Sequence, residues 1–333
     1  MTAGVRAFDD LTSRGRMRRL RALALDALRK YDLDVERCAF VSTGFNTVFR
    51  VETTTGSTYA LRVSPNLRIH ADGCELVEAA WVAALRRDTN VAVPRVIAAS
   101  DGSAVVWAEA AGVPGARSCV LFEWVRGQPL RERMRVELVR KTGELTAVVH
   151  EHGARYLSDP PAGALPADRV LYFLCEPRLE ELRPEYGSLL EDAVSRAQRA
   201  LDELWQQSPH PPHLLHGDIQ PGNVMVHRNE VTLIDFQDLI WGFEVQDVVI
   251  ALQGLEYRGD TGAGADAFRA GYESVRPWPD AEPATLVSLN AARRLNVLNF
   301  GLNLGGANLD AFVARNVAPI AKWMADRTSR SPS

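Results

Sequence analysis

The sequence has few of the features that mark secreted, disulfide-bonded or membrane proteins. Its four cysteines are scattered and show no paired spacing, so we expect reduced thiols and neither a disulfide framework nor a metal site. No apolar run approaches the roughly 20 residues that a membrane span requires. The N-terminus also lacks the hydrophobic segment of a signal peptide. These absences predict a cytoplasmic protein without a membrane partner.

Lysine is almost absent as well. Only three of the 38 basic residues are Lys, and the others are Arg. The formal net charge of −4 gives no broad reason to expect a nucleic-acid partner or binding to an anionic membrane. With 333 residues, of which 46% are hydrophobic, the chain is long enough to form two lobes with separate apolar cores. The oligomeric state is not fixed by the sequence, and both a monomer and a homodimer stay open.

The first third of the chain is rich in strand-forming residues. Residues 1–35 contain a basic amphipathic helix, which we expect to pack on its own protein as a helical extension. Within residues 36–127, the segment 38–63 is rich in Val, Thr, Phe and Tyr and is broken by two Gly-containing turns, which predicts three antiparallel strands. An apolar helical pattern over 74–88 is followed by further extended segments. We interpret 36–127 as one lobe.

The remainder of the chain, residues 128–330, has mainly helical patterns and is predicted to form a second lobe. The segment 131–153 predicts a long helix, with Gly153 as the stop after its last turn. A short strand pair around a polar turn is expected within 224–236, and helical segments follow. Strands in the first third and helices afterwards indicate an α+β protein with two lobes.

The stretch HGDIQPGN, residues 216–223, contains more than a turn requires. Pro and Gly suffice for a turn, yet Asp218 and Asn223 stand at a fixed separation in the same loop, and Asp235 ends the strand pair that follows. A hairpin of this length brings Asp235 back beside Asn223. An amide oxygen and a carboxylate are suitable ligands for Mg²⁺, which keeps several waters and binds phosphate oxygens. Turn formation alone is the competing interpretation, because Asp, Asn, Pro and Gly all favour turns.

This arrangement suits phosphoryl transfer. Metal ions neutralise the phosphates, and a carboxylate outside the metal shell orients the attacking hydroxyl and accepts its proton. We therefore predict Asp218 as the catalytic base and Asn223 and Asp235 as the metal ligands. HGDIQPGN together with LIDF resembles the motifs of the aminoglycoside phosphotransferase and choline kinase-like superfamily, relatives of the eukaryotic protein kinases. The resemblance implies a bilobal fold with a five-stranded antiparallel sheet and one main helix, a larger helical lobe, and ATP with Mg²⁺ in the cleft.

The resemblance also implies nucleotide-binding positions in the first lobe. STGFNTVFRV is similar to the hairpin that covers the phosphates, so backbone N–H groups of Gly44, Phe45 and Asn46 are expected to face them. YALRV is similar to the strand whose Lys binds the α- and β-phosphates, and here that position is Arg62. Arg can grip phosphate oxygens with its fork, and some members of the superfamily carry Arg there. Glu78, in preference to Glu75, is the expected partner of Arg62.

The segment VLFEWVRG is similar to the linker that holds adenine. The resemblance implies hydrogen bonds from the Glu123 carbonyl and the Val125 N–H, with Phe122 at the back of the pocket. Gln220 is expected either to donate to the γ-phosphate or simply to shape the loop.

Four further positions are expected to be mainly structural. His216 resembles the family's histidine before the catalytic Asp, which is mostly structural, and a role as general base is the alternative. His150 and His152 are expected to be solvated or core residues, with metal ligation as the alternative. Asp247 is expected to be an N-cap, to which the resemblance adds a role in bracing the catalytic loop.

The acceptor is the least determined part of the prediction. We expect an ATP-dependent phosphotransferase that acts on a hydroxyl of a small molecule, such as an amino acid, an amino alcohol, a sugar or an aminoglycoside-like compound. The alternatives are a bacterial Ser/Thr protein kinase of the stress-response type and a non-catalytic nucleotide-binding regulator. Arg293 and Arg294 are expected either to bind a carboxylated or sugar acceptor or to cap helices.

Overall fold

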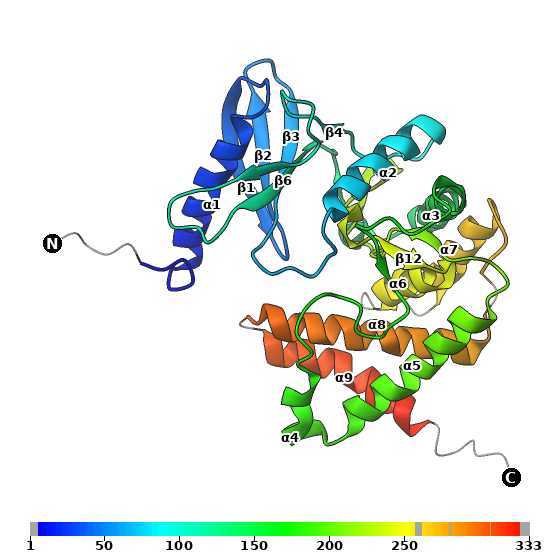
Figure 1. Cartoon of the computed structure of the whole chain (residues 1–333). Coiled ribbons are helices and arrows are strands. Elements are labelled where there is room, and N and C mark those ends of the chain that lie inside the picture. The colour runs from blue at the N-terminus through cyan, green and yellow to red at the C-terminus, as the bar shows by residue number, and fades with distance from the viewer. Residues whose placement is uncertain (1–5, 257–261, 280, 307, 327–333) are drawn as a thin grey trace, which may run out of the picture. The chain divides into compact units, whose positions relative to one another are not determined.

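The computed structural model describes residues 6–256, 262–279, 281–306 and 308–326. The chain divides into two compact units, shown with their elements in Figure 1. The first comprises residues up to Arg68, Glu75–Asp88 and Ala92–Arg126, and the second comprises the rest. Each unit has its own buried apolar cluster. The architecture is therefore α+β, as the sequence predicts.

The first unit is built on an antiparallel sheet of six strands in the order β1-β2-β3-β6-β4, with β5 also paired to β6. Its strands are β1 (Val35–Thr43), β2 (Thr47–Thr53), β3 (Thr58–Val63), β4 (Val96–Ile97), β5 (Val106–Ala108) and β6 (Arg117–Glu123). The sheet has one strand more than predicted, because both β4 and β5 pair with β6. The helix α2 (Cys74–Asp88) follows β3 in sequence.

The helix α1 (Ser13–Leu28) packs on this sheet. Its residues Leu23, Ala27 and Leu28 share one buried cluster with Phe49 and Leu61 of the strands. Thr12 caps the helix, with its hydroxyl accepting the Gly15 N–H at 3.2 Å. The N-terminal helix thus packs on its own protein, as expected, and lies in the same compact unit and core as the sheet.

The second unit is mainly helical. Its helices are α3 (Val136–Tyr156), α4 (Arg183–Tyr186), α5 (Leu189–Gln207), α6 (Glu244–Glu256), α7 (Ala263–Glu273), α8 (Pro283–Leu304) and α9 (Leu309–Ala325). Side chains of α5, α6, α8 and α9 contribute to one buried apolar cluster. The prediction that Gly153 ends the long helix is wrong. Gly153 is buried inside α3, which continues to Tyr156.

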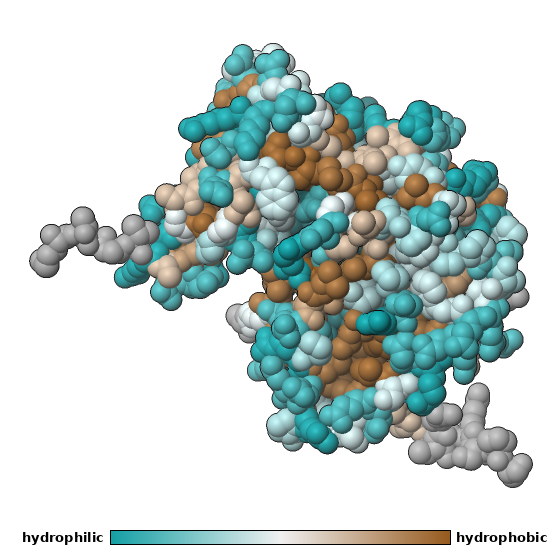
Figure 2. Space-filling model, viewed as in Figure 1, coloured by the Kyte–Doolittle hydropathy of each residue, from teal (hydrophilic) through white to brown (hydrophobic). Residues whose placement is uncertain are grey.

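Short strands in the second unit frame the loops that carry the polar motifs. One small sheet joins β7 (Gln128–Pro129), β10 (Val224–His227) and β11 (Glu230–Leu233), and another joins β8 (Leu165–Pro166), β9 (His213–Leu215) and β12 (Ile240–Gly242). None of the helices in the described part of the chain has the length and apolar character needed to cross a bilayer. Figure 2 shows hydrophilic residues over much of the visible face of each unit, with hydrophobic patches between them.

Two glycines let α3 and α7 cross at very short range. A Cβ on Gly143 would lie 2.0 Å from the Phe268 carbonyl oxygen, and a Cβ on Gly271 would lie 1.9 Å from the Arg140 carbonyl oxygen. Backbone atoms cannot move aside as the end of a flexible side chain can. The close helix contact therefore depends on the absence of a side chain at both positions.

We expect Gly271→Ala to separate α3 from α7 and to lower the free energy of unfolding by about 1–3 kcal/mol or more, because added atoms in a packed interior force the backbone to shift. Urea unfolding followed by circular dichroism measures the change. Gly44→Ala is the matched control, since its Cβ would meet no atom within 4 Å. Equal stability of Gly271→Ala and the wild-type protein would contradict this account of the crossing.

Candidate active site

The loop that carries Asp218 is held by a buried carboxylate from α6. Asp247 accepts the backbone N–H groups of His216 and Gly217, each at 2.9 Å. Gly217 has a φ of +79°, and a Cβ there would lie 1.9 Å from the Asp238 carbonyl oxygen. Only glycine combines that backbone conformation with so close an approach. Asp247 lies inside the first turn of α6, so it braces the loop and is not an N-cap.

The brace extends into the core through His150 of α3. His150 is fully buried, and its ring nitrogens lie 3.3 Å from an Asp247 oxygen and 2.9 Å from the Tyr272 hydroxyl. Burial alone would raise the pKa of Asp247, but His150, His216 and the loop N–H groups lower it overall. Asp247 therefore stays ionised and can accept several hydrogen bonds. His150 is a core residue, as expected, with a bracing contact that the sequence did not predict.

His216 supports the loop from the other side. Its Nδ1 accepts the Asp218 N–H at 3.1 Å, and its Nε2 lies 3.2 Å from the Ile234 carbonyl oxygen, to which it donates in the neutral tautomer. Burial lowers the pKa of His216, which keeps the ring neutral. The Ile234 N–H in turn donates to the Asn223 carbonyl at 2.9 Å. The backbone N–H and the backbone carbonyl of Ile234, the residue before Asp235, are thus both tied to the loop.

This pairing brings the two candidate metal ligands to the same end of the hairpin. Val224 pairs with Leu233, so Asn223 and Asp235 both lie just beyond the paired residues. Asp235 has a left-handed backbone with a φ of +64°, a conformation that costs energy and is enriched at functional sites. Within the described ranges, no group of three or more His, Cys, Asp or Glu side chains is arranged to hold a metal. The candidate site therefore has one amide and one carboxylate.

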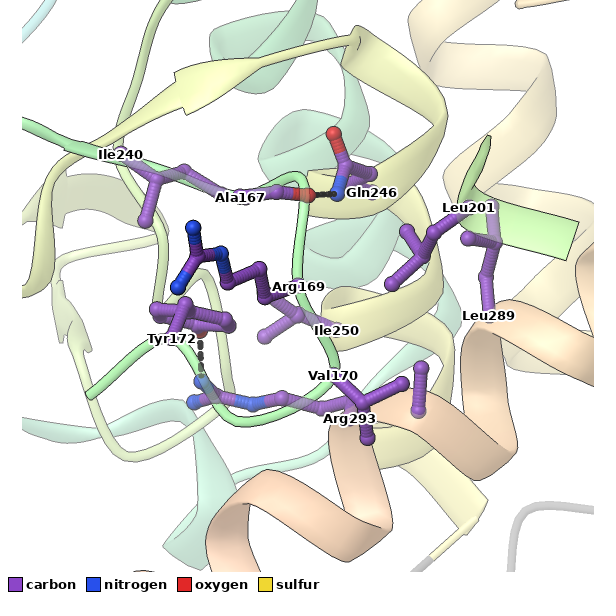
Figure 3. A pocket seen from close by; sticks show the side chains of 11 residues that line it. Ala167, Arg169, Val170, Tyr172, Leu201, Ile240, Gln246, Ile250, Leu289 and Arg293 are labelled. Atoms are coloured by element: carbon purple, nitrogen blue, oxygen red, sulfur yellow. Dashed lines mark hydrogen bonds between the residues drawn. The ribbon is translucent and has the colours of Figure 1, made fainter. Parts of the chain in front are cut away.

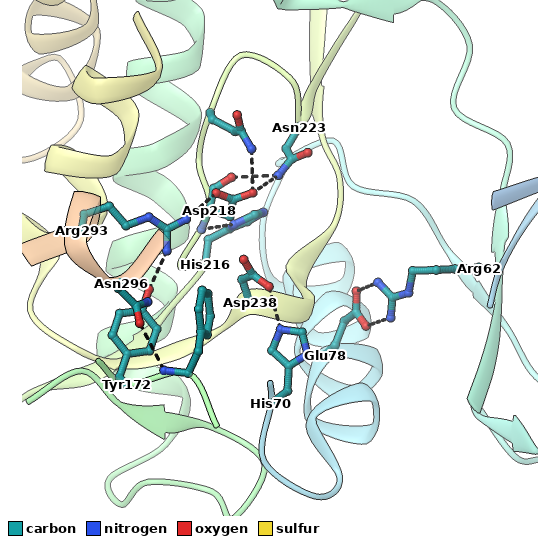
Figure 4. A network of polar contacts seen from close by, with 12 residues as sticks. Arg62, His70, Glu78, Tyr172, His216, Asp218, Asn223, Asp238, Arg293 and Asn296 are labelled. Atoms are coloured by element: carbon teal, nitrogen blue, oxygen red, sulfur yellow. Dashed lines mark hydrogen bonds and ion pairs between the residues drawn. The ribbon is translucent and has the colours of Figure 1, made fainter. Parts of the chain in front are cut away.

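Polar side chains surround the carboxylate of Asp218 (Figure 4). Asn223 Nδ2 donates to Oδ2 at 2.6 Å, and Gln220 Nε2 donates to the same oxygen at 2.9 Å. Arg293 donates to Oδ1 at 2.8 Å. Burial raises the pKa of Asp218 to about 6 despite the opposing charge of Arg293, with a further increase from Asp238. A carboxyl group with this pKa is ionised near neutral pH and is a stronger base than a solvated aspartate.

Four residues near Asp218 were not identified from the sequence as parts of one site with it: Arg293, Tyr172, His70 and Asp238. Arg293 also donates to the Tyr172 hydroxyl at 2.6 Å. The ring nitrogen Nε2 of His70 lies 2.7 Å from Asp238 Oδ1. Burial alone would raise the pKa of Asp238, but the hydrogen bond and charge of His70 outweigh it and lower the pKa. These residues come from segments far apart in the chain, and no local motif marks them.

The first unit contains the expected Arg62–Glu78 pair. Arg62 NH1 donates to Glu78 Oε1 at 2.8 Å, and its NH2 bonds the other carboxylate oxygen. Both side chains are buried, and the guanidinium carbon lies 5.2 Å from the centre of the Phe122 ring. Glu75 instead accepts a hydrogen bond from Ser118 at 2.6 Å. The fork of Arg62 is therefore oriented by Glu78.

The other positions predicted to bind nucleotide lie at two ends of this sheet's strands. Gly44, Phe45 and Asn46 form the turn between β1 and β2, where the Gly44 N–H donates to the Asn46 carbonyl at 3.0 Å. That amide is engaged within the turn in this conformation. Glu123 is the last residue of β6, and its N–H donates to the Arg95 carbonyl at 2.8 Å. The predicted contact with adenine uses the other backbone group of Glu123, its carbonyl. Val125 lies just beyond that strand.

Comparison with protein families gives one extended match. The model of a phosphotransferase enzyme family matches residues 38–283. Curated relatives include the homoserine kinase of Mesorhizobium japonicum, 26% identical over 214 residues that cover 63% of each chain. The homoserine kinase of Gluconobacter oxydans is 31% identical over 158 residues, which cover 46% of this chain and 49% of that kinase. The chain thus matches 63% of the length of the first relative and 49% of the length of the second.

Solved structures match over a larger share of the chain. A microcompartment-associated aminopropanol kinase has a TM-score of 0.70 at 25% identity, and the match covers 90% of this chain and 94% of that one. The amicoumacin kinase hAmiN, solved with AMP-PNP and Ca²⁺, has a TM-score of 0.67 at 19% identity and covers 93% and 96%. At that identity, the second likeness establishes the fold alone.

We expect Glu78→Ala to lower the free energy of unfolding by about 3–5 kcal/mol, because it leaves the buried Arg62 charge without its carboxylate. Thermal and urea unfolding both measure the loss. Glu52→Ala is the control, since Glu52 pairs with Arg50 at 2.9 Å but both side chains are partly exposed, and loss of such a pair costs about 1 kcal/mol or less. Similar losses in both variants would show that burial of the Arg62 pair has no special weight.

Proposed function

Because the chain belongs to the phosphotransferase enzyme family, we propose that it transfers the γ-phosphate of ATP to a hydroxyl group of a small molecule. The observation that carries this proposal is the joint placement of Asp218, Asn223 and Asp235. The loop and the hairpin are joined by the Ile234 peptide, and Asn223 bonds Asp218 directly. A base beside an oxygen-rich metal site is the arrangement that phosphoryl transfer requires.

Asp218 is the proposed base. It orients the acceptor hydroxyl and takes its proton while the acceptor oxygen bonds the γ-phosphorus and the bond from that phosphorus to the β,γ-bridging oxygen breaks. Asn223 and Gln220 hold one oxygen of the carboxylate. Oδ1, which bonds Arg293 in this structure, is the oxygen that must receive the hydroxyl. Asp247 fixes the backbone from which Asp218 projects.

Asn223 and Asp235 are the proposed ligands of Mg²⁺, which would neutralise phosphate charge when bound. The donor set fits: Asn223 directs its amide nitrogen at Asp218, which leaves the amide oxygen for a cation, and Asp235 adds an exposed carboxylate. Two protein ligands suit a cation that retains waters and phosphate oxygens. The structure of the related-fold kinase hAmiN with AMP-PNP and Ca²⁺ supports a nucleotide with a divalent metal.

Arg62 is proposed to bind the α- and β-phosphates, with Glu78 holding its fork. The turn at Gly44, Phe45 and Asn46 would cover the phosphates, which requires the Gly44 N–H to leave the Asn46 carbonyl or the neighbouring amides to serve alone. For adenine, the proposed contacts are the backbone of Glu123 and Val125, with Phe122 alongside.

The acceptor is proposed to be a small hydroxylated amine or amino acid. Homoserine kinases are among the curated relatives, and an aminopropanol kinase is among the similar structures. Homoserine and an aminopropanol share a hydroxyl and an amino group and differ in whether a carboxylate is present. These relatives support a metabolite-sized acceptor in preference to a protein acceptor.

We expect Asp218→Asn to reduce phosphate transfer by at least about 10²–10⁴-fold, since the amide keeps the shape of the side chain but cannot accept the proton. Purified protein with Mg-ATP and a panel of hydroxylated amines and amino acids gives the rate, and calorimetry with AMP-PNP checks nucleotide binding. Asp202→Asn on α5 is the control, because Asp202 is exposed and bonds only Gln198 among the contacts described. Transfer by Asp218→Asn within a few-fold of wild type would refute the assignment of the base.

We expect Asp235→Asn to weaken metal binding by about tenfold or more, the scale on which even supporting residues of metal sites act. Asn tolerates the left-handed backbone, so the fold should persist. Titration of Mn²⁺ in the presence of AMP-PNP, followed by electron paramagnetic resonance, measures affinity without turnover. Asp238→Asn is the comparison, since His70 already engages that carboxylate. Unchanged Mn²⁺ affinity in Asp235→Asn would remove Asp235 from the ligand set.

A further inference from the structure

A buried arginine occupies the face of Asp218 where the acceptor must arrive. Arg293 projects from α8, and its side chain is only 9% exposed. It bonds Asp218 Oδ1 at 2.8 Å and the Tyr172 hydroxyl at 2.6 Å (Figure 4). A guanidinium has more N–H donors than these two bonds use. Arg293 can therefore take a further anionic partner while it keeps Tyr172.

The same arginine lines a small cavity in the helical unit (Figure 3). The cavity measures about 30 Å³, enough for a water molecule or a group of a few atoms. Its charged lining residues are Arg169 and Arg293, and no acidic residue lines it. In the view of Figure 3 the ring of Tyr172 lies between the two arginines. Most of the lining is apolar, and its only charges, those of the two arginines, suit a small negatively charged group.

Tyr172 adds a donor to this lining. Its oxygen accepts from Arg293, and among the described contacts its own proton has no acceptor. Burial raises the pKa of Tyr172 to about 12, so the hydroxyl stays protonated at neutral pH. A guanidinium and a hydroxyl donor side by side match the two oxygens of a carboxylate.

The charge balance during the reaction points to the same ligand. Asp218 becomes neutral when it takes the proton of the acceptor hydroxyl, and Arg293 then loses the carboxylate to which it is bonded. Asp238 is engaged by His70 at 2.7 Å. A buried cation without a counterion is costly, whereas an anion supplied by the acceptor would balance Arg293 throughout the step.

We propose that the acceptor carries a carboxylate, which Arg293 and Tyr172 bind at this cavity, and that this contact draws Arg293 from Asp218 Oδ1 and frees that oxygen for the acceptor hydroxyl. The inference rests on the proposed phosphotransferase function. One hydrogen bond of about 2.8 Å would join the acceptor carboxylate to Arg293, and another would join the acceptor hydroxyl to Asp218. The two groups of the acceptor are then separated by one short carbon chain. A small hydroxyamino acid fits this spacing, and an amino alcohol lacks the recognised group.

The test compares acceptors that differ only in the carboxylate. Homoserine and threonine are each paired with the aminopropanol that remains after decarboxylation, and serine is paired with ethanolamine. With full-length protein and Mg-ATP, we expect kcat/KM to favour the carboxylated member of the preferred pair by about 100-fold or more, because an acceptor without the group leaves buried donors unpaired. Sodium acetate, which supplies the carboxylate separately, is expected to raise turnover of the matching amino alcohol severalfold.

Three variants assign the effect to residues. Arg293→Gln is expected to abolish the preference and the acetate response, and Tyr172→Phe, which removes only a hydroxyl, is expected to reduce the preference about 5–10-fold. Arg294→Gln is the matched control on the same helix, since the Arg294 side chain is also largely buried but bonds Glu256 at 2.8 Å. It is expected to retain the preference. If Arg293→Gln does not fold, Tyr172→Phe and the acetate response decide the question.

The outcomes that overturn the inference are distinct from failure of the proposed function. Equal or better use of amino alcohols by the wild-type protein would overturn it. So would an equal loss for both members of a pair in Arg293→Gln, which would make Arg293 a positioning residue for Asp218 alone. ATP binding without transfer to any hydroxyl compound would refute the proposed function itself, and the inference would fall with it. Transfer only to uncarboxylated acceptors would sustain the function and reject the inference.

Discussion

The active-site geometry depends on the buried carboxylate of Asp247. Asp247 accepts the N–H groups of His216 and Gly217 and so fixes the backbone between β9 and Asp218. Gly217 permits the turn because it has no side chain that would collide with the Asp238 carbonyl. His150 and Tyr272 connect this carboxylate to α3 and α7. Those two helices cross where glycines let their backbones meet. The placement of Asp218 therefore depends on how the helices of the core pack.

The sequence was most informative where the chemistry is local. Asp218 and Asn223 lie in one loop, and the length of the following hairpin determines that Asp235 returns to its start, so their grouping follows from spacing alone. The pairing of Arg62 with Glu78 was anticipated for a different reason. It came from the resemblance to a family, because a strand residue and a helix residue separated by a loop have no register that spacing could fix.

Contacts between segments far apart in the chain could not be predicted from the sequence. Tyr172 and Arg293 are separated by more than a hundred residues, and neither lies in a motif. Arg293 meets both Tyr172 and Asp218 only because α8 packs against the segment that follows β8. The sequence indicates extended character where β4 lies, but the resemblance implies only five strands, and β4 has only two residues, too few for a periodic pattern that would mark it as a sixth. The low helix propensity of Gly predicts a helix stop at Gly153, whereas burial in α3 overrides that preference.

The left-handed backbone of Asp235 limits what this position can become. Most side chains would clash with their own carbonyl group in that conformation, and Gly, Asn and Asp tolerate it best. Among these residues only Asp is negatively charged. Loss of the charge through Asn or Gly would thus preserve the path of the chain, while a change to Glu, which keeps the charge, would strain it. At this position a single amino acid meets the demands of the backbone and those of the proposed cation site together.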